Sequence, residues 1–151
     1  MKSKIIPDLS SRPIVMSLER QMDASADLIY DAWTRDFDCW FAEPGEVLMQ
    51  PEIDKPYFFR TKKEWGSHPH HGRFVELEKN RLVVMTWLTG KNGTDGNETV
   101  IRIELTPNEK GTHLRITHSG FADKDSCQGH IDNWPAALDS LEEGVQKLVR
   151  N

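Results

Sequence analysis

Two hydrophobic periodicities follow one another along this chain, and their order limits the folds that it can adopt. Between residues 46 and 121 apolar and polar residues alternate, as at Ile101, Ile103 and Leu105, which is typical of half-buried strands. From about 127 to 149 apolar residues recur at helical spacing, which predicts a long amphipathic helix. Short turns between the strands indicate an antiparallel meander. Such a sheet has one face to bury, and only the final helix is long enough to cover it.

Upstream of these strands, the sequence predicts one further strand and two short helices. Ile14, Met16 and Leu18 alternate with more polar residues, which suits a half-buried strand. A short amphipathic helix follows, with Ser25 as its N-cap, and a second helical turn is expected over residues 36–41. The predicted fold class is therefore α+β. We expect a curved antiparallel sheet of about six or seven strands around the C-terminal helix, with two short helices after the first strand.

Pro135 lies inside the helical C-terminal segment and leaves two ways to place the helix. Proline is best tolerated in the first helical turn, so the regular helix would begin near Asn133 or Trp134 after a looser lead-in. The alternative is one longer helix that is kinked at Pro135.

The length of 151 residues fits a single domain. Residues 1–11 are polar with an early proline, so we expect them to form a flexible tail before a domain over residues 12–151. No apolar run approaches the roughly 20 residues that a membrane-spanning helix needs. The first residues carry lysines but no apolar core of a secretory signal. We therefore expect a cytoplasmic protein with no membrane span, in which Cys39 and Cys127 stay reduced.

The charge of the chain argues against nucleic acid as a partner. The net charge is −5, and lysine and arginine are spread along the sequence. A nucleic-acid binder normally gathers them into a basic face.

Four segments, in a fixed order, resemble the START-like (SRPBCC) superfamily, also called birch-pollen-allergen-like or helix-grip. These segments are AWTRDFDCWF, HGRFVELEKNRLVVMTW, GTHLRITHSGF and GHIDNWPAALDSLEEGV. Over residues 12–149 the chain is similar to the bacterial branch related to the activator of heat-shock-protein-90 ATPase. It departs from that pattern at Pro56 and Tyr57, where a glycine pair is usual, and in the histidine-rich segment KEWGSHPHHG.

The resemblance implies a helix-grip fold with a cavity between sheet and helix. It does not imply one function, because relatives bind small molecules, catalyse cyclisation or hydrolysis, or regulate a chaperone. Some relatives are dimers, so a homodimer is a further expectation.

Large aromatic residues are numerous and are the first candidates for ligand binding. They line a small-molecule pocket or pack in a core, and the sequence leaves both readings open for each. Trp87, at the end of a strand, and Trp134, near the start of the final helix, are the best pocket candidates. The full set is Trp40, Phe41, Phe59, Trp65, Trp87 and Trp134.

Histidines are the second group of candidates. His68, His70 and His71 fall in a predicted turn, GSHPHHG, and their spacing matches no known metal motif, so we expect a solvated loop. A metal site remains the alternative if the turn folds toward His118. His118 shares its parity with inward residues of its strand and should point inward. It would then be a satisfied core residue, a ligand contact or an acid–base group.

Charged residues within one predicted strand form the last group. Arg73 and Glu76 lie on opposite faces by simple alternation, so one of them should face the cavity, where it would need a partner or a ligand. Alternation does not decide which one.

Together these observations favour a binding protein for a small apolar or aromatic molecule, without a cofactor. No nucleophile elbow, phosphate-binding glycine loop or zinc-protease motif is present in the sequence. A cavity enzyme of the cyclase or hydrolase type, with His118 as acid–base, is the first alternative. A chaperone-cofactor-like protein interaction is the second, although the predicted outer face of the sheet is polar.

Overall fold

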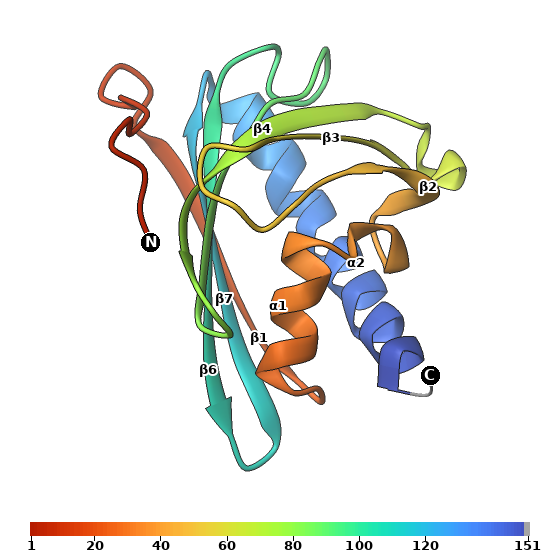
Figure 1. The fold of residues 1–151 in the computed structure, drawn as a ribbon. Coiled ribbons are helices and arrows are strands. Elements are labelled where there is room, and N and C mark those ends of the chain that lie inside the picture. Colours follow the sequence, from red (N-terminus) through yellow and green to blue (C-terminus); the bar gives the residue numbers. More distant parts are fainter. Residues whose placement is uncertain (150–151) are drawn as a thin grey trace.

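The computed structural model describes residues 1–149 of the chain. Seven antiparallel strands form one curved sheet in the order β1-β7-β6-β5-β4-β3-β2 (Figure 1). The predicted fold class is confirmed. The elements are β1 (Ile14–Met22), α1 (Ala26–Thr34), η1 (Phe37–Cys39), β2 (Ala42–Leu48), β3 (Pro56–Thr61), η2 (Lys63–Trp65), β4 (Pro69–Glu78), β5 (Leu82–Trp87), β6 (Thr99–Asn108), β7 (Gly111–Phe121) and α2 (Lys124–Val149).

The long helix α2 and the short helix α1 lie on the same side of the sheet, beneath the curved β2, β3 and β4 (Figure 1). Of the two placements that Pro135 left open, the longer helix is observed, because α2 runs without interruption for 26 residues. Its Leu138, Leu141 and Val145 are fully buried. These residues follow helical spacing, so one stripe of α2 covers the sheet as the sequence predicts.

Alternation along β6 and β7 sorts side chains between the two faces of the sheet. Ile101 and Ile103 on β6, and Leu114 and Ile116 on β7, are completely buried. Arg102 and its neighbours of opposite parity are more exposed. The buried face of the sheet and the buried stripe of α2 form one hydrophobic core with the aromatic residues of α1, η1 and β3.

Helix α2 and the segment η1 approach each other closely at Gly144. A methyl group on Gly144 would lie 2.5 Å from the carbonyl oxygen of Cys39 and 2.9 Å from Cβ of Trp40. Only glycine allows this separation of the two backbones. The contact holds α2 against the turn that carries Trp40 and Phe41.

The first residues of the chain lie against the outer face of the sheet, away from the helices (Figure 1). Lys2 forms an antiparallel bridge with Glu76 of β4, and the amide of Ser3 donates to the carbonyl of Val75 at 2.6 Å. The flexible tail predicted for residues 1–11 therefore begins with backbone that is paired to β4.

Strand β4 begins earlier than the sequence predicts. The segment GSHPHHG, expected to be a turn, contributes its last four residues to β4, where Pro69 pairs with Arg60 and His70 with Phe59 of β3. Backbone pairing with β3 extends the strand through residues of low strand preference. As a consequence His70 is buried, whereas His71 is exposed on the opposite face.

Candidate functional site

A pocket of about 670 Å³ opens between the sheet and the N-terminal half of α2. Its walls come from five parts of the chain: Phe41 between η1 and β2, the end of β3 with η2, the start of β4, the end of β5 with the segment after it, and α2. A volume of this size falls in the range of small-molecule sites. The residues that line it are Phe41, Thr61, Trp65, His68, Pro69, His70, Trp87, Thr89, Gly90, Lys91, Asn92, Gly93, Gly129, His130, Asn133, Trp134, Ala136 and Ala137.

Four aromatic side chains form the apolar part of this pocket. The rings of Trp87 and Trp134 have their centroids 5.7 Å apart, and Phe41 lies 5.6 Å from Trp87 and 5.4 Å from Trp65. Trp87 and Trp134 are almost fully buried, while Trp65 is partly exposed. Such a wall favours flat apolar ligands, because aromatic faces gain from stacking as well as from burial.

The six aromatic candidates from the sequence divide into two groups. Phe41, Trp65, Trp87 and Trp134 line the pocket. Trp40 and Phe59 lie outside the lining, in the core behind it. The indole N–H of Trp40 donates to the carbonyl of Ala32 at 2.8 Å, which ties η1 to α1.

His70 lines the pocket from β4 and is not the solvated loop residue that the sequence suggests. Its ring stacks on Phe59, with centroids 5.0 Å apart, and meets the edge of Trp87 at 4.8 Å. Nδ1 lies 3.0 Å from the carbonyl oxygen of His68. A carbonyl oxygen only accepts, so Nδ1 carries the proton and Nε2 is left as an acceptor. Burial lowers the pKa of His70 to about 4, so the ring is neutral at pH 7.

His130 of α2 is a pocket residue that the sequence reasoning missed. Its Nδ1 lies 2.8 Å from the carbonyl oxygen of Ser126, one helical turn earlier, so this nitrogen also carries the proton. Burial lowers the pKa of His130. The available signal was its position four residues before Trp134, which places both residues on one face of a helix.

His118 is buried beneath the pocket and both of its ring nitrogens have partners. The indole N–H of Trp134 donates to Nδ1 at 3.2 Å. Nε2 lies 2.8 Å from the hydroxyl oxygen of Thr99, which itself donates to the carbonyl of Trp87 at 2.6 Å. An indole only donates, so Nδ1 must accept and the proton must sit on Nε2. Burial holds the pKa of His118 well below its usual value.

Neither Arg73 nor Glu76 faces the pocket, so the expectation that one of them points inward is wrong. The register of β4 shifts between Phe74 and Glu76, which marks a β-bulge. Simple alternation fails across a bulge because two residues oppose one on the neighbouring strand. Phe74 is therefore buried in the core, while Glu76 pairs with Val84 on the outer face.

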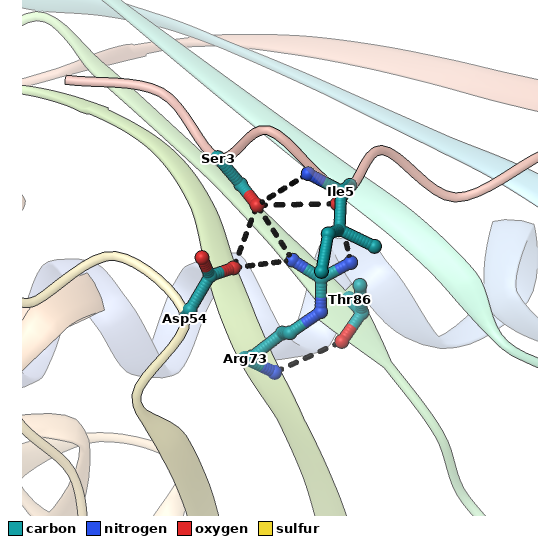
Figure 2. A network of polar contacts seen from close by, with 5 residues as sticks. All are labelled: Ser3, Ile5, Asp54, Arg73 and Thr86. Carbon is teal, nitrogen blue, oxygen red and sulfur yellow. Dashed lines mark hydrogen bonds and ion pairs between the residues drawn. The ribbon is translucent and has the colours of Figure 1, made fainter.

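Arg73 instead joins the first residues of the chain to the loop before β3 (Figure 2). Its guanidinium donates to the carboxylate of Asp54 at 2.7 Å and to the carbonyl of Ile5 at 2.6 Å. The hydroxyl of Ser3 also donates to Asp54, at 2.7 Å. The Arg73 backbone amide donates to the hydroxyl of Thr86 at 2.9 Å. This network is structural and lies on the face of the sheet opposite the helices.

The mouth of the pocket is bordered by the loop between β5 and β6. Thr89 and Thr94 exchange hydrogen bonds, with each amide donating to the other's hydroxyl at 2.7 to 2.8 Å. The hydroxyl of Ser126, in the first turn of α2, donates to the carbonyl of Gly93 at 2.6 Å. The loop is thus closed on itself and attached to α2. It brings Lys91 and Asn92 to the pocket rim.

Both cysteines are unpaired and lie outside the pocket lining. Burial raises the pKa of the Cys39 thiol to about 12 and also raises the pKa of Cys127. Within residues 1–149, no three histidine, cysteine or acidic side chains are grouped to hold a metal ion.

An antiparallel sheet that encloses a pocket against a long C-terminal helix defines a START-like protein. A family model described as "Activator of Hsp90 ATPase homolog 1-like protein" matches residues 23–146, and the chain belongs to this family. The resemblance drawn from the four sequence segments is confirmed. No curated protein matches the chain. None of the helices within residues 1–149 has the length and apolar character needed to cross a bilayer.

Solved structures with low sequence identity share the fold. A protein from Mesorhizobium loti has a TM-score of 0.72 at 22% identity, over 89% of this chain and 98% of that one. A protein from Chromobacterium violaceum has a TM-score of 0.72 at 19% identity, over 87% and 96%. The Aha1 dimer from Colwellia psychrerythraea, a solution structure, has a TM-score of 0.67 at 22% identity, over 87% and 96%.

Proposed function

We propose that this protein binds a small apolar or aromatic molecule in the pocket between β4, β5 and α2. The observation that carries the proposal is the pocket of about 670 Å³ with Trp87, Trp134 and Phe41 in its lining. Aromatic side chains that line open space, with a few polar groups around them, are typical of small-molecule sites. A small apolar ligand would fill this space in contact with these residues.

Binding accounts for the geometry better than catalysis by His118 does. Both nitrogens of that ring are engaged, by Trp134 and by Thr99, so neither is free to exchange a proton with a ligand. His118 also lies outside the pocket lining. Its role in this proposal is to hold the indole of Trp134 in place.

A pocket-filling substitution tests the proposal. Gly129 lines the pocket, and a side chain there would meet no atom within 4 Å at its Cβ. Gly129→Leu should therefore fold normally and occupy part of the pocket. Gln128→Leu, at the exposed neighbouring position, is the matched control.

The measurement is a titration of all three proteins with lipids, sterols and flat aromatic compounds, followed by tryptophan fluorescence and thermal unfolding. We expect at least one compound class to raise the Tm of the wild type and of Gln128→Leu, because a ligand that binds only the folded state stabilises it. Gly129→Leu should lose that response. Equal responses in wild type and Gly129→Leu, or none from any compound, would count against the proposal.

We also propose that the chain forms a homodimer, which the dimer of the Colwellia psychrerythraea relative supports. Light scattering during size-exclusion chromatography tests this directly. A mass of one chain, near 17.4 kDa, would contradict it.

A further inference from the structure

The pocket contains two histidine rings whose Nδ1 atoms both donate to the backbone, so that Nε2 of each is a hydrogen-bond acceptor. His70 and His130 both line it, the first from β4 and the second from α2. Each uses Nδ1–H to donate to a backbone carbonyl, that of His68 and that of Ser126. The backbone therefore fixes the tautomer of both rings, and Nε2 of each is left with a lone pair.

Within the described part of the chain, neither Nε2 atom has a hydrogen-bond donor. Water can serve them while the pocket is open. A ligand that displaced this water without offering donors would leave two acceptors unpaired in a largely apolar site, which lowers affinity. A ligand that carries donors at the matching places avoids that cost.

The electrostatics of the pocket favour a neutral ligand. Burial keeps His70 and His130 uncharged at neutral pH, because it lowers the pKa of each. Lys91 is the one lysine or arginine in the lining, and it is exposed at the rim. A carboxylate held in this pocket would find acceptors where it needs donors.

We propose that the ligand is a neutral, flat aromatic molecule with hydroxyl or N–H groups at two places, which donate to Nε2 of His70 and Nε2 of His130. This inference rests on the proposed function, since it names the chemistry of the molecule that the pocket binds. The aromatic body fills the space beside Trp65, Trp87 and Trp134, and the two histidines select its donor pattern from different walls.

A pair of probes that differ only in their donors tests this inference. A dihydroxynaphthalene and its dimethyl ether have the same aromatic body, and naphthoate replaces the donors by a charged acceptor. Binding is measured by calorimetry at neutral pH. We expect the diol to bind about 4- to 100-fold more tightly than the ether, because each of its two neutral hydrogen bonds contributes about 2- to 10-fold. Naphthoate should bind more weakly than the diol.

Variants assign the preference to the two histidines. His70→Phe and His130→Phe keep a ring and remove the acceptor, so each should weaken diol binding about 2- to 10-fold. Neither should weaken ether binding, because the acceptor that the ether leaves unpaired is gone. His71→Phe, on the exposed face of β4, is the matched control and should keep the wild-type preference. His70→Gln restores an acceptor oxygen and should recover part of the preference. His70→Gln also provides a second test of this position if His70→Phe does not fold.

The outcomes separate this inference from the function on which it rests. Equal affinity of wild type for diol and ether, both lost in Gly129→Leu, would overturn the donor requirement and leave the pocket proposal standing. A diol preference that persists in both phenylalanine variants would also overturn it. Absence of binding by every probe, with no difference between wild type and Gly129→Leu, would overturn both the donor requirement and the proposed binding function.

Discussion

The indole N–H of Trp134 donates to Nδ1 of His118 across the boundary between α2 and β7, at 3.2 Å. His118 in turn bonds to Thr99 of β6, which bonds to the carbonyl of Trp87 at the end of β5. The chain of bonds links helix and sheet directly beneath the pocket. It sets the position of two indoles that line the pocket, so stability and the shape of the pocket depend on the same contacts.

The bond between Trp134 and His118 should appear as a coupling energy. His118→Phe keeps an aromatic ring of similar size but leaves the buried Trp134 N–H without an acceptor, which should cost about 1 to 3 kcal/mol of unfolding free energy. Trp134→Phe removes the donor. In a double-mutant cycle by urea denaturation, we expect a coupling of about 0.5 to 3 kcal/mol. Strictly additive effects would mean that the bond contributes nothing to stability.

Buried neutral histidines should make the fold sensitive to acid. The usual pKa of histidine is 6.5, and that of folded His70 is about 4, so the unfolded chain takes up a proton in this interval and the folded chain does not. Stability present above pH 6.5 is therefore lost as the pH falls toward 4, by roughly 3 kcal/mol from His70. The pKa values of His118 and His130 are also lowered, and act in the same direction.

Urea denaturation across this pH range measures the effect. His68, His71 and His130 lie near enough to His70 that their charges, when they are protonated, lower its pKa further. His70→Phe should reduce the decline in unfolding free energy between pH 6.5 and 4. His71→Phe, on the exposed face, should leave most of that decline unchanged. A decline that is identical in both variants would assign the acid sensitivity to other groups.

Two glycines of α2 should respond to alanine in opposite ways. At Gly144 the added methyl group meets the Cys39 carbonyl at 2.5 Å, so Gly144→Ala should destabilise the protein by about 1 to 3 kcal/mol. At Gly129 nothing lies within 4 Å, so Gly129→Ala should stabilise it by about 0.5 to 1 kcal/mol through helix propensity. Both values come from urea denaturation. A stable Gly144→Ala would show that η1 moves easily away from α2.

The contacts of Arg73 should hold the first residues of the chain on the sheet. Arg73→Met keeps the aliphatic stem and removes the bonds to Asp54 and Ile5. Because the side chains of Arg73 and Asp54 are 22% and 48% exposed, we expect a loss of about 1 kcal/mol or less. Hydrogen exchange at Ser3 should rise more clearly than global stability falls.

The control for this measurement is Arg102→Met, which breaks an exposed contact with Glu104 at 3.6 Å on β6. In Arg102→Met, hydrogen exchange at the start of the chain should stay at the wild-type rate. The same low exchange rate in Arg73→Met would show that backbone pairing with β4 alone retains this segment.

The fold could be predicted from the sequence because its signals are local. Alternation along β6, with Ile101 and Ile103 inward, and helical spacing from Leu138 to Val145 each depend only on neighbouring residues. The order of these signals then leaves few ways to bury the apolar faces. Thus the sheet, the long helix and the inward direction of His118 follow from the pattern.

The candidate site was harder to predict because its residues depend on pairing between distant segments. His70 enters the pocket because β3 extends β4 through a sequence that is typical of a turn. Arg73 and Glu76 leave the inner face because a bulge changes the parity of β4, and no local signal marks that bulge. For the aromatic residues, composition alone does not separate Trp87, in the pocket, from Trp40, in the core behind it.

Indole N–H signals provide the most direct measurement of the central claim, that a ligand occupies this pocket. The chain has 5 tryptophans, so an amide and indole ¹⁵N spectrum contains one such signal for each. On titration with a bound aromatic compound, the signals of Trp65, Trp87 and Trp134 should move. Those of Trp33 and Trp40, which do not line the pocket, should move little. Large shifts at Trp33 and Trp40 with Trp87 unchanged would contradict the account.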